Sequence, residues 1–553
     1  MRVSELFVKC LENEGVQYVF GLPGEENEDL LFALDASPIR FVPCRHEQGA
    51  AFMANIWGRL TGRAGVCLST LGPGATNLIT GIADANLDKA PLVAITAQGG
   101  TTRLHHESHQ YLNIVEMFRP IVKWNTAISS PRVVTEVVRK AFKVAEYEKS
   151  GATHIELSED LAEMELGAED EHTRPLPPTR PRYPGPDREA IDQATSLLES
   201  AHRPLIIAGN GAIRELASTQ LTEFVRRYDI PVVSTFMGKG AISDRMDQSL
   251  MAIGLSFKDY VVEAVERADL VLAVGYDIAE YAPQRWNPGA DKPIVHIDFV
   301  PAEVYAHYVP VVEVVGDIGD TIGELSARLE GRPPAFDADW YPPIRRRIMD
   351  DIRSYALGDG DLFTIPGALC VIREIMDDCG LLISDVGTHK LWTARNFPTY
   401  CANGCIISNG LASMGVALPG AIAASLVDPE RQVVAVMGDG GFLMNSQELE
   451  TARRLGVNFT AIIFNDNDYG LISWKQMMAK GRSVSTRIGN PDFKAYAESF
   501  GIKAYRPGST AELKQQLQEA ITSRRLSVVE IPVDVRVNRT LVENLRAYWR
   551  GQS

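Results

Sequence analysis

Residues 436–470 read VMGDGGFLMNSQELETARRLGVNFTAIIFNDNDYG, and this stretch decides the fold that we predict. Two apolar runs each end at an acidic turn, with Asp439 between glycines and Asp466 between asparagines. The segment between the two turns is long enough for one helix, a short loop and a strand. Apolar runs that alternate with helices are typical of parallel strands buried on both faces. The stretch therefore predicts a strand–helix–strand unit of a parallel sheet.

The same pattern recurs along the chain, for example in GVCLSTLGPGATNLITGIADA and PLIIAGNGAIRELASTQLTEFVRRY. Two stretches depart from it, the proline-rich residues 166–186 and residues 331–360, and we predict both to be linkers. Three blocks remain, 1–165, 187–330 and 361–553, of which the first and third resemble each other loosely. The predicted fold class is α/β, with three Rossmann-like domains built on parallel sheets.

Composition restricts the possible partners. The chain has 553 residues and a net charge of -16 without a Lys/Arg-rich block, so we expect neither nucleic acid nor an anionic membrane as a partner. No apolar run reaches the roughly 18 residues of a membrane span. The opening MRVSELFVKCLENEG lacks the regions of a signal peptide, and its Val3, Leu6, Phe7, Cys10 and Leu11 follow helical spacing instead. We expect a cytoplasmic protein.

Cysteine and histidine spacing gives little support for a cysteine or histidine metal site. Seven scattered cysteines indicate free thiols rather than a disulfide framework. Cys401 and Cys405 have no second cysteine or histidine pair nearby, and the HHESH stretch at 105–109 lacks a companion carboxylate pattern.

The two acidic turns point to a different kind of metal site. Both carboxylates should lie at one edge of the sheet, where they repel each other unless a cation lies between them. Mg²⁺ with oxygen ligands fits and would bring phosphates, which the backbone N–H groups at Gly440 and Gly441 could bind. Either motif alone is compatible with an ordinary turn. Their combination at two strand ends favours the metal site, although neither a Walker loop nor a complete dinucleotide fingerprint is present.

Further motifs reveal a family resemblance. The paired turns resemble the thiamine diphosphate motif, and RHEQGAAFMA, GRLTG and LSTLGPGATNL resemble the pyrimidine-binding domain of the thiamine diphosphate-dependent acetolactate synthase family. The stretches ISNGLASMGVALPGAIAAS and SDVGTHKLW resemble its diphosphate-binding domain. The resemblance covers essentially the whole chain. It implies a pyrimidine-binding domain at 1–165, a central domain and a diphosphate-binding domain at 361–553.

The resemblance also implies a set of ligands. Asp439 and Asp466 would bind Mg²⁺ through their side chains, and Asp468 through its main-chain carbonyl. The implied thiamine diphosphate contacts are Glu47, Gly387, His389, Ala412, Met414, Gly438, Asp439, Gly440, Gly441, Asp466, Tyr469 and Gly470. Met414 matches the residue wedged beneath the cofactor, and Ala412 would offer its carbonyl.

Three catalytic residues follow from the same resemblance. Glu47 in RHEQ matches the glutamate that protonates the aminopyrimidine ring nitrogen, whose imino group then removes the thiazolium proton. Gln110 and His109 in SHQYLN would line the substrate pocket. The family's glutamate acts across a dimer interface, which implies a homodimer or homotetramer with active sites at that interface.

The implied reaction is carboligation, which makes the enzyme a transferase. Pyruvate loses CO₂ on thiamine diphosphate, and the resulting enamine adds to a second 2-oxo acid to give 2-acetolactate. LVLAVGYDIAEYAPQRWN resembles the flavin-free catabolic synthases, and GNGAIR is an incomplete glycine fingerprint, so we expect no FAD. Lys475 stands where the resemblance places tryptophan or glutamine, and it could pair with an acceptor carboxylate or point to solvent, which leaves the acceptor open.

Two other interpretations remain. The first is another thiamine diphosphate-dependent 2-oxo acid decarboxylase or carboligase with a different acceptor. Glyoxylate carboligation is disfavoured because that family lacks the glutamate kept here in RHEQ. The second is a catalytically dead scaffold, which the intact Glu47, Asp439 and Asp466 argue against.

Overall fold

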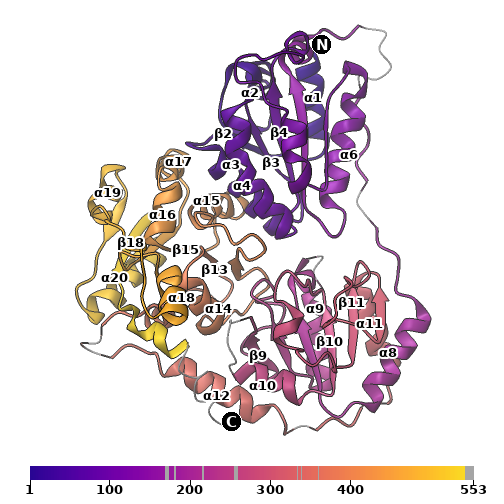
Figure 1. Ribbon diagram of the computed structural model, residues 1–553, viewed down its shortest axis with the longest axis vertical. Coiled ribbons are helices and arrows are strands. Elements are labelled where there is room, and N and C mark those ends of the chain that lie inside the picture. The colour runs from indigo at the N-terminus through magenta and orange to yellow at the C-terminus, as the bar shows by residue number, and fades with distance from the viewer. Residues whose placement is uncertain are drawn as a thin grey trace. The chain divides into compact units, whose positions relative to one another are not determined.

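The structure is a computed structural model that describes residues 1–167, 174–179, 182–214, 217–254, 260–332, 334–337, 339–358, 360 and 362–541. Its strands form three six-stranded sheets, and every strand pair is parallel. Helices alternate with the strands along the chain (Figure 1). The predicted α/β class with three parallel sheets is confirmed.

The first sheet has the strand order β2-β1-β3-β4-β6-β5. Its strands are β1 (Tyr18–Gly21), β2 (Arg40–Pro43), β3 (Gly65–Ser69), β4 (Leu92–Gln98), β5 (Trp124–Ala127) and β6 (Ala152–Ser158). The helices of this region are α1 (Val3–Asn13), α2 (Glu28–Asp35), α3 (Glu47–Thr61), α4 (Pro73–Leu87), α5 (Ile114–Phe118), α6 (Val134–Glu146) and α7 (Glu159–Glu163). Every residue of β4 and β6 is buried, as strands covered on both faces require.

The third sheet repeats this topology with the order β14-β13-β15-β16-β18-β17. Its strands are β13 (Leu381–Ser384), β14 (Cys405–Ile407), β15 (Val433–Gly438), β16 (Thr460–Asn465), β17 (Lys503–Tyr505) and β18 (Ser527–Pro532). The helices in this part of the chain are α13 (Ile365–Ile375), α14 (Thr388–Asn396), α15 (Ala417–Val427), α16 (Asp439–Asn445), α17 (Glu448–Leu455), α18 (Gly470–Lys480), α19 (Phe493–Ser499) and α20 (Thr510–Thr522). The shared order agrees with the loose resemblance of the first and third sequence blocks.

The central sheet has a different order, β12-β11-β10-β7-β8-β9. Its strands are β7 (Pro204–Ala208), β8 (Val232–Ser234), β9 (Ser249–Ala252), β10 (Leu270–Val274), β11 (Ile294–Asp298) and β12 (Val312–Val315). Its helices are α8 (Arg188–Ser200), α9 (Ser218–Tyr228), α10 (Tyr260–Arg267) and α11 (Ile318–Arg328). This is the strand order of dinucleotide-binding folds, whose ligands bind where the order reverses, here between β7 and β10.

The chain divides into two compact units. The first unit comprises Met1–Arg182, Gly410–Pro429 and Leu443–Val457, and the second unit comprises the rest. Helices α15 and α17 therefore belong with the first sheet, where α15 packs on α3. Each unit is described by itself below.

Helix α1 shows how the amphipathic pattern builds the first unit. The five apolar residues that the helical spacing singled out are all at most 3% exposed. They join a core that includes residues of α6 and of the first sheet. The predicted helix with a buried apolar face is confirmed.

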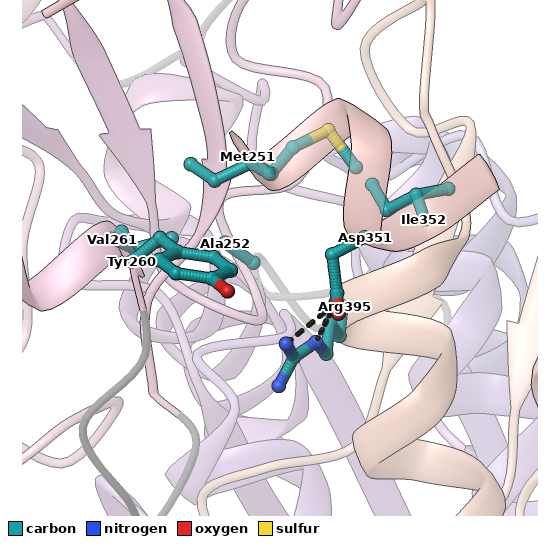
Figure 2. Close-up of a pocket in the computed structure, with 8 residues that line it drawn as sticks. Met251, Ala252, Tyr260, Val261, Asp351, Ile352 and Arg395 are labelled. Atoms are coloured by element: carbon teal, nitrogen blue, oxygen red, sulfur yellow. Dashed lines mark hydrogen bonds and ion pairs between the residues drawn. The ribbon is translucent and has the colours of Figure 1, made fainter. Parts of the chain in front are cut away.

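Helix α12 (Pro342–Arg353) lies in the stretch predicted as the second linker. It buries Ile344, Ile348 and Ile352 in the core of the central sheet. Next to it, Arg395 donates to Asp351 Oδ2 at 2.6 Å (Figure 2). The adjoining cavity of about 20 Å³ has room for about one water molecule, so it is no substrate site.

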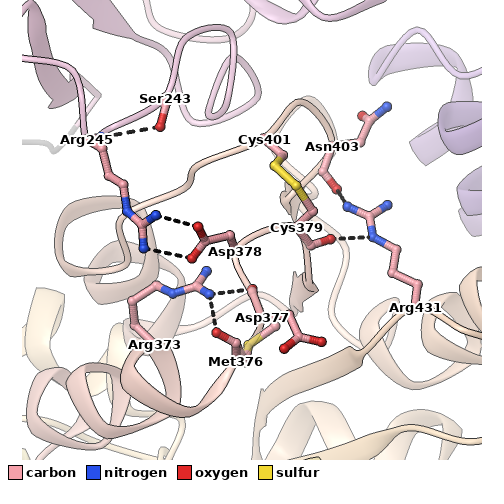
Figure 3. Close-up of a disulfide and its surroundings, with 10 residues drawn as sticks. All are labelled: Ser243, Arg245, Arg373, Met376, Asp377, Asp378, Cys379, Cys401, Asn403 and Arg431. Carbon is pink, nitrogen blue, oxygen red and sulfur yellow. Dashed lines mark hydrogen bonds and ion pairs between the residues drawn. A yellow bond between two sulfur atoms is a disulfide. The ribbon is translucent and has the colours of Figure 1, made fainter.

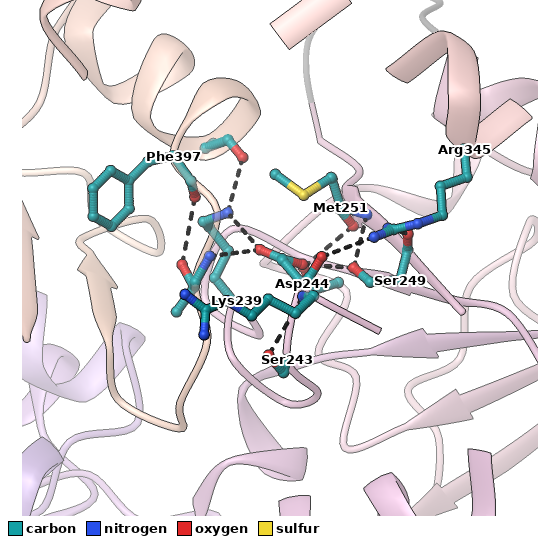
Figure 4. Close-up of polar contacts among 11 residues, drawn as sticks. Lys239, Ser243, Asp244, Ser249, Met251, Arg345 and Phe397 are labelled. Atoms are coloured by element: carbon teal, nitrogen blue, oxygen red, sulfur yellow. Dashed lines mark hydrogen bonds and ion pairs between the residues drawn. The ribbon is translucent and has the colours of Figure 1, made fainter. Parts of the chain in front are cut away.

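A buried polar cluster joins the central block to the third within the second unit. The Asp244 carboxylate accepts hydrogen bonds from Ser249 Oγ at 2.5 Å and from the Thr399 N–H at 2.7 Å (Figure 4). Lys239, which is fully buried, lies 3.8 Å from Asp244 and donates to the Ala394 carbonyl at 3.2 Å. A buried charge is tolerated only when it is paired and hydrogen-bonded, and this cluster meets that condition.

One sequence prediction is wrong. Cys379 and Cys401 form a disulfide, with their Cα atoms 5.4 Å apart, so these two are not free thiols. The pair lies in the loops that precede the neighbouring strands β13 and β14, and Arg431 donates to the carbonyl of Cys379 at 2.8 Å (Figure 3). A separation of 22 residues gave no sign of this proximity, which arises because parallel neighbours begin at the same sheet edge.

The remaining cysteines are free thiols, as predicted. Free thiols are found at Cys10, Cys44, Cys67, Cys370 and Cys405. None of the helices in the described ranges combines the length and the apolar character needed to cross a bilayer.

Candidate active site

The two acidic turns lie side by side in the second unit. Strands β15 and β16 pair in parallel, with Gly438 opposite Phe464. Asp439 and Asp466 therefore leave the sheet at the same carboxyl edge, as predicted, and α16 begins at Asp439.

Three donors hold the Asp439 carboxylate. Its Oδ1 accepts from the Gly440 N–H at 2.8 Å, and its Oδ2 accepts from the Asn467 N–H at 2.8 Å and from Asn490 Nδ2 at 2.7 Å. Asn490 also donates to Asn465 Oδ1 at 3.0 Å. One amide thus connects both acidic turns and orients the Asp439 side chain.

The electrostatics of the pair call for a cation. Burial, together with the negative charge of Asp439, raises the pKa of Asp466 to about 7. Burial also raises the pKa of Asp439, against the effect of its donors. Two partly desolvated carboxylates that repel each other are stabilised by a divalent ion between them.

The available oxygen atoms fit Mg²⁺. Across the described parts of the chain, no three His, Cys, Asp or Glu side chains are grouped to hold a metal. A third protein ligand to an ion at Asp439 and Asp466 would then be a neutral oxygen, either an asparagine amide oxygen or a backbone carbonyl, and the sequence predicts the carbonyl of Asp468 for this role. Asp468 donates its backbone N–H to Asp466 Oδ1 at 3.1 Å, so the turn is already folded around that carboxylate.

Glycines at this edge of the sheet allow neighbouring side chains to lie directly against the backbone. A Cβ atom added at Gly470 would lie 2.5 Å from Asp466 Oδ2, and one at Gly440 would lie 2.8 Å from the Tyr469 ring. A Cβ at Gly441 would lie 2.7 Å from Asp385 Oδ2. A larger residue at these positions would displace Asp466, Tyr469 or Asp385 from the edge where the acidic turns lie.

His389 lies at the same edge and is 2% exposed. Burial lowers the pKa of its imidazole to about 3, while a hydrogen bond to the Asp385 backbone opposes that shift. Among the described residues its Nε2 has no hydrogen-bond partner. A Cβ at Gly387 would lie 2.7 Å from the imidazole ring, and one at Gly438 would lie 3.5 Å from it. The unpartnered ring atom and the tight glycines fit a site that a ligand's polar group completes.

Glu47 lies in the first unit as the first residue of α3. Its carboxylate is 7% exposed and accepts a hydrogen bond from Asn77 Nδ2 at 2.9 Å. Its Oε1 also lies 3.4 Å from where a Cβ of Gly74 would be. The glutamate is thus held against the N-terminal turn of α4, where small residues leave room for it.

Gln110 approaches the same turn. A Cβ atom at Gly72 would lie 2.8 Å from the Gln110 carbonyl oxygen. Both residues have positive φ angles, 53° at Gly72 and 57° at Gln110. Gln110 and the adjacent His109 are exposed. The fold therefore brings Glu47 next to Gly74 and Gln110 next to Gly72, two glycines of LSTLGPGATNL, and His109 is the chain neighbour of Gln110.

Two buried aspartates, Asp84 in α4 and Asp88 directly after it, position the segment that carries Ala412 and Met414. The Gly410 N–H donates to Asp88 Oδ1 at 2.6 Å, and the Ser413 N–H donates to Asp84 Oδ1 at 3.4 Å. Ala412 adopts a left-handed conformation with a φ of 57°. This segment belongs to the first unit with Glu47, whereas the two acidic turns and His389 belong to the second.

Sequence reasoning missed several residues of these sites. Asp84 and Asp88 follow helical i, i+4 spacing in GIADANLDKA, which marks one face of α4 but gives no partner. Asn77, Asn490 and Glu448 carry no local signal, because their partners are distant in the chain.

Comparison with known proteins identifies the class of enzyme to which the chain is similar. Three family models match in chain order: "Thiamine pyrophosphate enzyme, N-terminal TPP binding domain" over residues 1–117, "Thiamine pyrophosphate enzyme, central domain" over 191–325, and "Thiamine pyrophosphate enzyme, C-terminal TPP binding domain" over 385–531. Thiamine pyrophosphate is another name for thiamine diphosphate. The chain thus carries the domains of an enzyme that binds this cofactor.

Relatives that match nearly the whole chain narrow the class. The chain is 36% identical to the catabolic acetolactate synthase of Raoultella terrigena, over 98% of this chain and 97% of that protein. It is 32% identical to the acetolactate synthase of Bacillus subtilis (strain 168), over 98% and 95%. It is 33% identical to a probable acetolactate synthase large subunit of Methanocaldococcus jannaschii, over 97% and 92%. The chain therefore belongs to the acetolactate synthase family of thiamine pyrophosphate enzymes.

Proposed function

We propose that this protein condenses two molecules of pyruvate to 2-acetolactate and CO₂, using thiamine diphosphate and Mg²⁺. The observation that carries the proposal is the carboxylate pair Asp439 and Asp466 at adjacent strand ends, in a chain that carries the family's three domains. When bound, thiamine diphosphate supplies a nucleophilic carbon that decarboxylates a 2-oxo acid and passes the remaining two-carbon unit to an acceptor.

Residues of the second unit would bind the diphosphate group of thiamine diphosphate. Asp439 and Asp466 would bind Mg²⁺ through carboxylate oxygens, and Asp468 through its carbonyl. The backbone N–H of Gly441 would donate to a phosphate oxygen, and Gly440, whose own N–H donates to Asp439 Oδ1, would lie against the diphosphate. The other proposed contacts in this unit are Gly387, His389, Gly438, Tyr469 and Gly470.

In the first unit, Glu47 would hold a proton at its carboxyl for the ring nitrogen of the aminopyrimidine. The Asn77 hydrogen bond to Oε2 orients that carboxyl and leaves Oε1 for the ring. Ala412 would offer its carbonyl to the aminopyrimidine, and Met414 would support the cofactor from below. Their segment is suited to this because its hydrogen bonds to Asp84 and Asp88 hold it on α4.

Gln110 and His109 would contact the 2-oxo acid, since both are exposed beside the turn at Gly72 and Gly74, against which Glu47 packs. Lys475 on α18 is also exposed, which supports a role in attracting the acceptor carboxylate rather than a structural role. An acceptor other than pyruvate is the second candidate.

The central domain supports the proposal that FAD is absent. In a dinucleotide-binding fold, the pyrophosphate binds at the glycine turn after the first strand, here Gly209 and Asn210 after β7. Glu280, which follows β10, occupies that place: its carboxylate accepts from the Asn210 N–H at 3.0 Å and from Thr235 Oγ1. A buried carboxylate on this N–H competes with the phosphate of a dinucleotide.

We further infer a cytoplasmic homodimer or homotetramer with active sites at the dimer interface. We also propose the domain limits 1–165, 187–330 and 361–553.

The deciding experiment incubates purified protein with pyruvate, Mg²⁺ and thiamine diphosphate, without FAD, and identifies products by NMR. Accumulation of 2-acetolactate that stops without thiamine diphosphate is expected.

The other outcomes of this experiment are informative. Acetaldehyde or acetate in place of 2-acetolactate would shift the assignment to a decarboxylase with a different acceptor. Unchanged pyruvate would contradict the proposal. A Glu47→Gln variant is the matched control, because glutamine can still accept from Asn77 but cannot hold the proton.

A further inference from the structure

Glu448 is a buried acidic residue of the first unit to which the proposed function assigns no role. It is the first residue of α17 and is 0% exposed. Its Oε1 accepts hydrogen bonds from the backbone N–H groups of Arg45 at 3.0 Å and His46 at 3.1 Å. Its Oε2 accepts from Thr451 Oγ1 at 2.6 Å.

The two backbone donors belong to the turn from β2 into α3, directly before Glu47. A second residue of α17 holds the other side of this turn, because Arg454 donates to the Pro43 carbonyl. Glu47 is the first residue of α3, so the turn determines where its side chain starts. Helix α17 therefore forms hydrogen bonds to the backbone of the turn directly before Glu47.

The neighbouring residues are adapted to this contact. A Cβ added at Gly49 would lie 2.7 Å from Glu448 Oε1, so glycine is needed for the carboxylate to reach the turn. Burial raises the pKa of Glu448, and its hydrogen bonds to Thr451, Arg45 and His46 oppose that shift. A buried carboxylate is costly, and an apolar residue of similar size would fill the same space without that cost. Only an acceptor, however, satisfies two consecutive N–H groups at once.

We propose that Glu448 is a positioning residue for Glu47. By binding the N–H groups of Arg45 and His46, it sets the start of α3 and thereby the direction of the Glu47 carboxyl. The inference rests on the proposed role of Glu47 as the group that holds the proton. Misplacement by about 1 Å at such a group is enough to slow a reaction about 100-fold.

The test compares Glu448→Ala and Glu448→Gln in the full-length protein. Glu448→Ala leaves both N–H groups without an acceptor, and we expect kcat to fall about 10- to 100-fold with little change in the KM for pyruvate. Glu448→Gln keeps an amide oxygen for the turn and should recover most of kcat. Hydrogen–deuterium exchange of cofactor-free protein provides a readout independent of activity: the Arg45 and His46 amides should exchange faster in the alanine variant only.

A matched control separates positioning from stability. Asp269, in the second unit, also accepts two consecutive backbone N–H groups, those of His202 and Arg203, both at 2.9 Å. Asp269→Ala should lower the melting temperature but leave kcat and exchange at the turn unchanged. If Glu448→Ala does not fold, Gly49→Ala serves instead, because its added methyl group displaces the carboxylate and should lower kcat in the same direction.

The outcomes distinguish this inference from the proposed function. If Glu448→Ala and Gly49→Ala keep wild-type kcat while Glu47→Gln is inactive, Glu448 is merely structural and the positioning role is overturned. If Glu47→Gln is as active as wild type, the proposed role of Glu47 fails first. Loss of kcat in Asp269→Ala comparable to that in Glu448→Ala would also overturn the inference, because activity would then follow stability alone.

Discussion

Replacing Asp466 by asparagine should stabilise the metal-free protein. The pKa of Asp466 is raised from 3.8 to about 7 by burial and by Asp439. A raised carboxyl pKa means that the folded state keeps a proton the unfolded chain has lost, so stability present below about pH 4 is lost as pH rises through about 7. Roughly three pKa units at 1.36 kcal/mol each give about 4 kcal/mol. Asp466→Asn removes this cost and keeps an oxygen that can accept from the Asp468 N–H at 3.1 Å.

Calorimetry in the presence of a chelator measures the effect. At about pH 8 the variant should melt on the order of 10 °C above wild type, given about 2–4 °C per kcal/mol for a domain of this size. The difference should shrink as pH falls toward 4, because the Asp466 carboxyl of the folded wild type is then protonated. Mg²⁺ with thiamine diphosphate should raise the melting temperature of wild type more than that of the variant. Equal melting of the two proteins at about pH 8 without metal would refute the electrostatic argument for a cation site.

Three further changes test other parts of the structure. Burial raises the pKa of Glu280 from 4.5 to about 7. The free energy of unfolding of wild type should therefore fall by about 3 kcal/mol as the pH rises between these two values. In Glu280→Gln, the melting temperature should depend less on pH over this range. In urea titrations, Gly58→Ala in α3 should lower the free energy of unfolding by about 1–3 kcal/mol, because the added methyl group would overlap the Pro91 carbonyl. Gly323→Ala in α11 has open space around it and should raise the free energy of unfolding by about 0.5–1 kcal/mol. Cys401→Ser should lower the oxidised protein's stability by about 3 kcal/mol, the loop-closure value for 22 residues, and dithiothreitol should abolish the difference from wild type.

The elements that sequence predicted best are those whose signal is local. The buried strands β15 and β16 are continuous apolar runs, and α1 has apolar residues at helical spacing, so periodicity alone identifies them. The proximity of Asp439 and Asp466 also followed from local pattern, because consecutive parallel strands end at the same edge.

What was not predicted depends on residues that are distant in the chain. Glu448 and the turn it holds are about 400 positions apart, and no periodicity relates them. The disulfide likewise depends on two loops that meet only once β13 and β14 pair.

The three α/β blocks, the acidic turns and the family could be identified from the amino-acid sequence, because each of these rests on local pattern or on motifs in chain order. Packing alone brings the buried groups together: Asn490 with Asp439, Asp84 with the Ser413 backbone, and Glu280 with the glycine turn of the central sheet. The physical reason is that a hydrogen bond or a desolvated charge depends on distance in space, which packing sets and sequence separation does not.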